Sequence, residues 1–206
     1  MPVFGMDSNR MRIERLGWSS FLLALGISAL WGGNFVALKT ALATIPPIWM
    51  AFWRMLLGSV VVALWAWSRG TRLTPAAGEW GPLAALGFMF TVQIALLNIG
   101  VDFTSPAYSV ILLNSHPIFA NTISHFFVPG DQLNRRRVTG LLIAFTGICL
   151  VFFGHPAAGL AEHPAAGNLI VTVSAVLLAA RIVYTKQVVQ HVEPVLAVVW
   201  QMLLSL

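Results

Sequence analysis

The chain has 206 residues, of which 58% are hydrophobic and only 9% are charged, and its mean hydropathy is +0.81. Soluble domains carry roughly 25% charged residues, so this composition excludes an ordinary soluble protein and predicts an integral membrane protein. The pI near 10.4 is better explained by basic residues on one side of a membrane than by nucleic-acid binding. We therefore expect the lipid bilayer, and not a nucleic acid, as the surrounding partner.

Long stretches without charged residues predict the membrane-spanning elements. Each stretch reaches the 18 residues expected of a spanning helix, and none shows the strict alternation of a half-buried strand. The charge-free stretches, and the one that contains only Arg54, are 16–38, 40–68 (with Arg54), 80–101, 103–130, 138–161 and 163–180. We predict an all-α polytopic membrane protein with six transmembrane helices, with residues 194–206 as the start of a seventh.

Basic residues between the predicted spans indicate an orientation. Eight arginines flank predicted spans on one side of the membrane, and they are Arg10, Arg12, Arg15, Arg69, Arg72, Arg135, Arg136 and Arg137. Lys39 is the one basic residue that flanks a predicted span on the opposite side. Positive residues near the ends of spans are retained in the cytoplasm. The amino terminus is therefore predicted to be cytoplasmic, with residues 1–15 as a cytoplasmic segment.

The chain contains an internal repeat. Residues Leu30 to Leu57 are similar to Leu177 to Leu204 at an offset of 147 residues, the difference between Lys39 and Lys186. The same offset superposes Pro47 on Pro194, Trp53 on Trp200 and Arg54 on Gln201. Five helices precede the second copy, so it would enter from the opposite face, as in the inverted repeats of secondary transporters. The second copy has only begun at residue 206, and we expect the chain as given to be incomplete.

Arg54 is the first candidate for a functional residue. It lies seven residues after Pro47, about 10 Å into a hydrocarbon core that is roughly 30 Å thick. An ionisable residue at such depth is a functional-site hypothesis by default, and the alternative is that it snorkels to the outer headgroups. Its counterpart Gln201 is also polar, which favours a side chain that faces a cavity. A guanidinium there would favour a substrate with a carboxylate or another anionic group.

Polar residues inside other spans are weaker candidates. Residues Asn114, Pro117, Asn121 and His125 follow one another at steps of three, four and four, which predicts one stripe along a proline-broken helix. This stripe could contact a ligand, or it could make interhelical hydrogen bonds worth about 0.6–2 kcal/mol each. The remaining intramembrane candidates are Asn34 and Gln93, together with Asn98. Arg181, near the end of its span, is expected to snorkel.

Several absences narrow the function. No Asp or Glu falls inside a predicted span, which argues against a carboxylate proton relay in this part of the protein. The sequence contains no glycine-rich phosphate loop, no HExxH and no Ser/His/Asp arrangement. We therefore expect no catalytic residue, no metal and no cofactor, and we do not expect an enzyme.

Three motifs carry a resemblance to a known family. They are Trp31-Gly32-Gly33-Asn34-Phe35 with Pro46-Pro47 and Arg54 downstream, Thr104-Ser105 to Pro117, and Gly130-Asp131-Gln132-Leu133 followed by Gly140 and Gly147. In this order and spacing the chain resembles the EamA-type drug/metabolite transporter family. One departure is Asp131, which stands where the family usually has Glu.

The resemblance implies a ten-helix carrier of a bacterial-type inner membrane, with two five-helix repeats around a central substrate cavity. Residues 16–154 would form the first repeat, 155–166 an external loop and 167–206 the start of the second. Arg54, Asn34 and the stripe from Asn114 to His125 would face the cavity. The chain would export or exchange a small polar metabolite or drug by alternating access. The alternative is a truncated, non-transporting remnant, or a half-unit that needs a partner chain in a homo- or hetero-oligomer.

Overall fold

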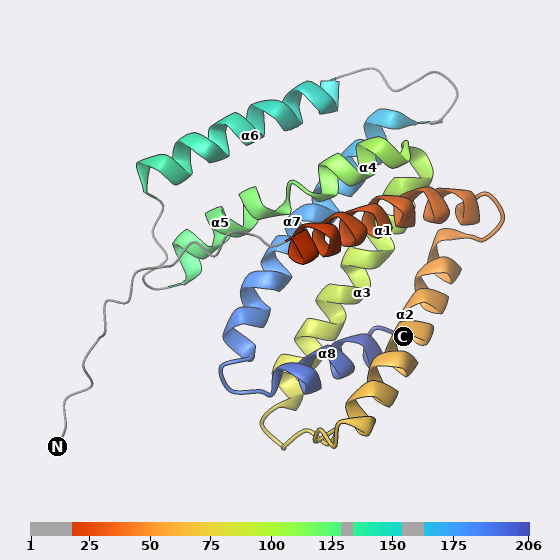
Figure 1. Ribbon diagram of the computed structural model, residues 1–206, viewed down its shortest axis with the longest axis vertical. Helices are drawn as coiled ribbons and strands as arrows, with labels where there is room; N and C mark the ends of the chain where they lie inside the picture. The colour runs from red at the N-terminus through yellow and green to blue at the C-terminus, as the bar shows by residue number, and fades with distance from the viewer. Residues whose placement is uncertain (1–17, 129–133, 154–162) are drawn as a thin grey trace. The chain divides into compact units, whose positions relative to one another are not determined.

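The computed structural model describes residues 18–128, 134–153 and 163–206, and within these ranges every regular element is an α-helix (Figure 1). This confirms the predicted all-α class. The helices are α1 (Trp18–Leu42), α2 (Pro47–Ser68), α3 (Trp80–Phe103), α4 (Pro106–Leu113), α5 (His116–Phe127), α6 (Arg135–Phe153), α7 (Pro164–Val188) and α8 (Pro194–Leu203). The predicted cytoplasmic segment 1–15, the turn at 130–133 and most of the loop 155–166 lie outside the described residues.

Prolines set the starts of four helices. Pro47, Pro106, Pro164 and Pro194 are the first residues of α2, α4, α7 and α8. Proline suits this position because its missing N–H would have no intrahelical partner there, and because its ring fixes a helical φ. At α4 the preceding Ser105 adds a cap, since its hydroxyl accepts a hydrogen bond from the Tyr108 backbone N–H.

The sequence pattern of the predicted span 103–130 predicts one proline-broken helix, whereas the structure has two helices there, α4 and α5. Pro117 has no N–H to donate to the carbonyl of Leu113, so the helical ladder stops there. The Leu113 oxygen instead lies 3.1 Å from Nδ1 of His116. The His116 side chain is thus a partner for the carbonyl that lacks its usual helical N–H donor because of Pro117. His116 therefore has a structural role at this break.

Four of the described helices are long and apolar enough to cross a membrane. They cover Ser20–Leu42, Pro47–Ser68, Trp80–Phe103 and Pro164–Val188. α8 is apolar but shorter, and the predicted span 138–161 runs into residues outside the described ranges. The chain is thus a multi-pass helical membrane protein, and the count of six spans plus the start of a seventh stays a prediction.

The chain forms two compact units, residues 1–34 and 35–206, whose boundary falls inside α1. In the second unit α3 and α7 make the most extensive helix pair (Figure 1). α8 packs against α3 and α2, while α4 and α5 pack against α7. α6 contacts α4 and α5. The second unit is therefore built around α3 and α7.

Two glycines allow α3 and α7 to approach closely. A Cβ added at Gly100 of α3 would lie 2.6 Å from Val171 Cγ2 and 2.9 Å from the Val171 backbone nitrogen. A Cβ added at Gly167 of α7 would lie 2.8 Å from the backbone of Phe103 and Thr104. In lipid, helices associate through such tight packing because apolar burial offers little driving force between them.

Polar side chains join the same two helices. The hydroxyl of Thr104 donates to Asn168 Oδ1 at 2.6 Å, at the glycine contact. Further along, Gln93 Nε2 donates to Ser174 Oγ at 3.3 Å, and this hydroxyl donates to the Gln93 backbone oxygen at 2.9 Å. Interhelical hydrogen bonds in membranes are worth about 0.6 kcal/mol on average, up to about 1.7. They therefore fix the register of α3 on α7 more than they add stability.

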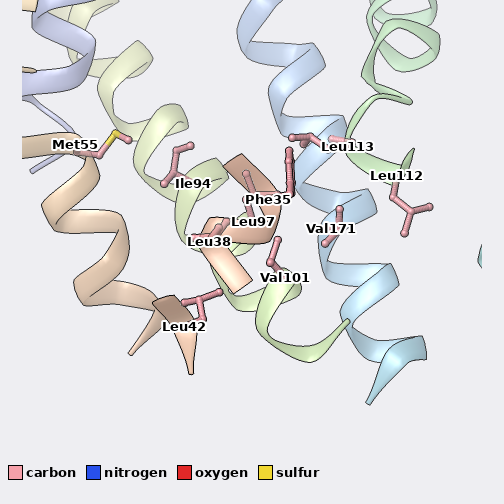
Figure 2. Close-up of a cluster of buried hydrophobic side chains, with 11 residues drawn as sticks. Phe35, Leu38, Leu42, Met55, Ile94, Leu97, Val101, Leu112, Leu113 and Val171 are labelled. Carbon is pink, nitrogen blue, oxygen red and sulfur yellow. The ribbon is translucent and has the colours of Figure 1, made fainter. Parts of the chain in front are cut away.

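A buried apolar cluster packs along the carboxyl-terminal half of α3 and the amino-terminal half of α7 (Figure 2). Its members come from the carboxyl-terminal half of α1 and from α2, α3, α4 and α7. They are Phe35, Leu38, Leu42, Met55, Ile94, Leu97, Val101, Leu112, Leu113, Val171 and Ala175. A second cluster, of Leu83, Leu86, Val188, Val192, Leu196 and Ala197, joins the start of α3 to the end of α7 and to α8.

Lys39 fastens the last part of α1 to the end of α3. Its ammonium group donates to the backbone oxygens of Val101, at 3.1 Å, and of Asp102. These carbonyls belong to the last turn of α3, where no intrahelical N–H is left for them and where the helix dipole favours a cation. Lys39 is therefore a capping residue as well as a charge at the end of a span.

We expect Gly100→Ala to lower the melting temperature of the purified protein. Its methyl group would meet the backbone of Val171, which cannot move aside as a side chain can, and overpacking of this kind costs about 1–3 kcal/mol. Thermal unfolding followed by circular dichroism measures the effect. Gly140→Ala in α6 is the matched control, because no described atom lies within 4 Å of its new Cβ. Equal melting temperatures for the two variants would contradict the close packing of α3 on α7.

Candidate functional site

Arg54 reaches from α2 to a buried amide on α3. Its Nη1 donates to Asn98 Oδ1 at 3.3 Å, and Asn98 Nδ2 donates to the Pro47 backbone oxygen at 3.2 Å. Asn98 is fully buried, so the two hydrogen bonds fix which end of its amide faces the guanidinium. The side chain of Arg54 thus turns toward α3. Asn98 in turn is hydrogen-bonded to the first residue of α2, the helix that carries Arg54.

The charge of Arg54 has no carboxylate partner among the described residues. Its hydrogen-bonded partner there is the neutral amide of Asn98, and the guanidinium carries five N–H donors in all. The side chain is half-buried, which leaves most of these donors open to water or to a ligand. A cation held by a neutral amide at this depth is suited to recognise an anionic group, which would supply the missing negative charge.

An apolar cavity of about 430 Å³ lies between α2, α3 and the last residues of the chain. Its lining residues are mainly hydrophobic, with Thr91 and Ser205 as the polar exceptions. They are Ile48, Trp49, Ala51, Phe52, Met55, Thr91, Ile94, Ala95, Ser205 and Leu206. A cavity of this size and lining is typical of sites that bind small molecules.

The amide of Asn98 relates the cavity to Arg54. Thr91, Ile94 and Ala95 form the α3 wall of the cavity, and Asn98 continues the same stripe by one helical turn. Arg54 is not among the lining residues, and it meets this stripe through Asn98. The resulting arrangement is an apolar cavity with a guanidinium–amide pair next to one end.

Gln93, another predicted cavity residue, points into the α3–α7 contact. It is 2% exposed and its side chain is bonded to Ser174, as described above. The structure therefore brings Gln93 together with α7 and not with Arg54. The amide that accompanies Arg54 is Asn98, which sequence reasoning noted only as an intramembrane amide.

The stripe of four predicted residues is distributed over the break between α4 and α5. Asn114 is the residue that follows α4, whereas Pro117, Asn121 and His125 belong to α5. Asn114 and Asn121 each donate to a backbone oxygen four residues earlier, Val110 at 2.8 Å and Pro117 at 2.7 Å. These amides therefore bond to their own chain segment, and the structure does not bring them to Arg54.

Asn34 is the last residue of the unit 1–34, whereas Arg54 and the cavity belong to the unit 35–206. The candidate role of Asn34 remains a prediction from the sequence.

Snorkelling would direct the Arg181 side chain toward the end of α7, but the structure shows it in contact with other helices. Its guanidinium carbon lies 4.6 Å from the centroid of the Phe90 ring on α3, and Nη1 donates to Gln201 Oε1 on α8 at 3.1 Å. Sequence reasoning missed this contact because it weighed Arg181 by its distance from the end of its own helix. The repeat offset, which already singled out Gln201, contained a signal for it.

Among residues 18–128, 134–153 and 163–206, no three His, Cys, Asp or Glu side chains come close enough together to hold a metal ion. The chemistry that the described site offers is hydrogen bonding and charge recognition by Arg54 and Asn98 beside an apolar cavity.

Proteins that are similar to this chain are named as transporters. An uncharacterized transporter of Archaeoglobus fulgidus is 29% identical over 63% of this chain and 44% of its own length. The uncharacterized transporter YoaV of Bacillus subtilis is 24% identical over 88% of this chain and 62% of its own length. A protein of Salmonella typhimurium named a probable amino-acid metabolite efflux pump is 27% identical over 82% of this chain and 54% of its own length.

The chain spans about half the length of these curated relatives. No solved structure matches it. The model of the EamA-like transporter family matches residues 18–153, which is more than half of the chain and includes Arg54, Asn98 and α1 to α6. The apolar helices, the transporter-named relatives and this match agree, and the chain belongs to the EamA-like transporter family.

Proposed function

We propose that the chain is part of a secondary transporter that exports or exchanges a small polar metabolite or drug by alternating access. A membrane transporter is the function that its family and its relatives support. The observation that carries the finer proposal is the contact of Arg54 with the buried Asn98 beside an apolar cavity. This combination suits a molecule with an apolar body and a carboxylate or another anionic group.

The physical argument concerns the cost of an isolated cation in the membrane. A charged side chain at the centre of a helix in a bilayer costs about 2.5–3.5 kcal/mol even by the smaller estimates. Arg54 could lower this cost by reaching the headgroups, but its guanidinium instead contacts an amide on α3. A transported anion would offset the charge while it is bound, which gives the arginine a role in recognition.

We also propose a membrane arrangement for this transporter. Six helices would cross a bacterial-type inner membrane, residues 194–206 would begin a seventh, and the amino terminus would be cytoplasmic. Support comes from the eight arginines on one side and from the 147-residue repeat, whose two copies fit an inverted pair. One relative is named a probable amino-acid metabolite efflux pump, which is consistent with export of a small molecule that carries a carboxylate.

Arg54→Ala is expected to abolish transport while the protein still inserts into the membrane. A charge-assisted hydrogen bond is worth about 1.5–3 kcal/mol, so loss of the guanidinium should weaken substrate binding about 10- to 100-fold. Efflux of a panel of amino acids and carboxylates is measured from cells that produce the chain, with immunoblots of membranes to confirm insertion. The control is Arg69→Ala, because Arg69 is exposed beyond the end of α2. Unchanged efflux in Arg54→Ala would contradict the role of Arg54 in substrate recognition.

Reporter fusions test the proposed orientation. Green fluorescent protein, which fluoresces only when it folds in the cytoplasm, is expected to fluoresce when fused after Arg137 and to stay dark when fused after Glu162. The basic cluster that ends at Arg137 provides the physical reason, since it should remain on the cytoplasmic side. Alkaline phosphatase at the same two positions provides the opposite readout. The reverse pattern for both reporters would overturn the orientation.

A further inference from the structure

A second guanidinium lies inside the helices of residues 35–206. Arg181 of α7 lies over the ring of Phe90 and donates from Nη1 to Gln201, a residue that is 9% exposed. Its Nε is buried and has no hydrogen-bond partner among the described residues. Buried donors nearly always have a partner, so this orphaned N–H indicates that an acceptor is missing from the contact.

The depth of this cation makes the missing acceptor significant. Phe90 lies ten residues after Trp80, about 15 Å along α3, which places the guanidinium near the middle of that helix. The described contacts of Arg181 are one aromatic ring and one neutral amide, and no carboxylate is among them. Neither contact neutralises the positive charge, whereas an anion would both neutralise it and accept from Nε.

The internal repeat relates this contact to Arg54. At the offset of 147 residues, Arg54 corresponds to Gln201 and Asn34 corresponds to Arg181. Each copy therefore has one arginine and one amide at these two positions, but the helices that carry them are exchanged. The first copy has its arginine on the second helix of the pair, α2, and the second copy has it on the first, α7.

The apolar cavity lies between the two arginine contacts along α3. Arg181 meets α3 at Phe90 and Arg54 meets it at Asn98, eight residues or about 12 Å further along. Thr91, Ile94 and Ala95, which form the α3 wall of the cavity, fall between these two positions. Gln201 of α8 lies four residues before the lining residue Ser205, which follows the end of that helix. Neither arginine is among the lining residues of the cavity, but the two contact α3 at positions just before and just after its α3 wall.

We propose that Arg181 and Gln201 form a second carboxylate-binding point, and that the substrate class is dicarboxylates whose two acidic groups are separated by an apolar chain. One carboxylate would bind Arg54, the apolar chain would lie along the α3 wall, and the other carboxylate would bind Nε and the free edge of Arg181. This inference rests on the proposed function, since it adds a second contact to the anion site of Arg54.

Binding of matched acids tests the inference. The purified full chain in lipid nanodiscs is titrated by calorimetry with α,ω-dicarboxylates of five to ten carbons and with the monocarboxylates of equal length. Empty nanodiscs correct for partition of the acids into lipid. At the best chain length we expect the dicarboxylate to bind at least tenfold more tightly than its monocarboxylate, because only the dicarboxylate can contact both guanidiniums.

Three variants separate the two arginines. R181Q should remove the preference for the dicarboxylate, whereas R54A should weaken both acids at least tenfold. The control R69A should change neither. If R181Q does not yield folded protein, Q201L serves instead, because it keeps the charge but removes the acceptor that orients it. Q201L should lower the preference severalfold.

The possible outcomes are distinguishable. If the wild-type chain binds both acids equally, and its monocarboxylate binding depends on Arg54, the second binding point is overturned and the proposed function stays intact. A preference that survives R181Q would overturn the role of Arg181 in the same way. Monocarboxylate binding that does not depend on Arg54, or no binding of any acid, would contradict the proposed function and the inference together.

Discussion

The close approach of α3 and α7 at Gly100 and Gly167 is the constraint on which the described helices depend. In lipid the association of helices depends on packing and on polar contacts, because the surrounding chains are as apolar as the helices. Because neither glycine has a Cβ, the two backbones can come into contact. The hydrogen bonds of Thr104 and Gln93 then set the register of α3 on α7. That register decides which residues of α3 face α2 and α8, and so it places Asn98 and Phe90 for their arginines.

Within this frame, polar groups in the apolar helices are satisfied by neutral partners and not by ion pairs. Arg54 is bonded to an amide, Arg181 to another amide and an aromatic ring, and Lys39 to the carbonyls that end α3. Lys39 completes a helix end, because both of its acceptors are carbonyls of the last turn of α3. The two arginines differ, since neither caps a helix and each retains N–H donors that the described residues do not satisfy. That difference is the physical reason to associate the arginines with a ligand and the lysine with the fold.

The sequence predicted the helical class and four of the long apolar helices, because charge-free runs and prolines are local signals. The cavity-facing role of Arg54 stays a prediction. It did not predict the end of α4, where the effect of Pro117 depends on how the freed carbonyl of Leu113 is satisfied. It did not pair Arg54 with Asn98, or Arg181 with Phe90, because these contacts depend on the register between helices distant in the chain. Asn114 and Asn121 looked like ligand contacts, yet a helical amide can equally bond to its own backbone.

The most direct test of the account is whether the Arg54 guanidinium faces the protein or the lipid headgroups. Solid-state NMR of the chain in phospholipid bilayers, with labelled arginine and asparagine, can measure dipolar contacts from the guanidinium to side-chain amides and to lipid phosphorus. Comparison with an Arg54→Gln sample assigns the signals. The account predicts a contact between Arg54 and the amide of Asn98 and none with phosphorus. A strong phosphorus contact without the amide contact would show that Arg54 snorkels, and would contradict the account.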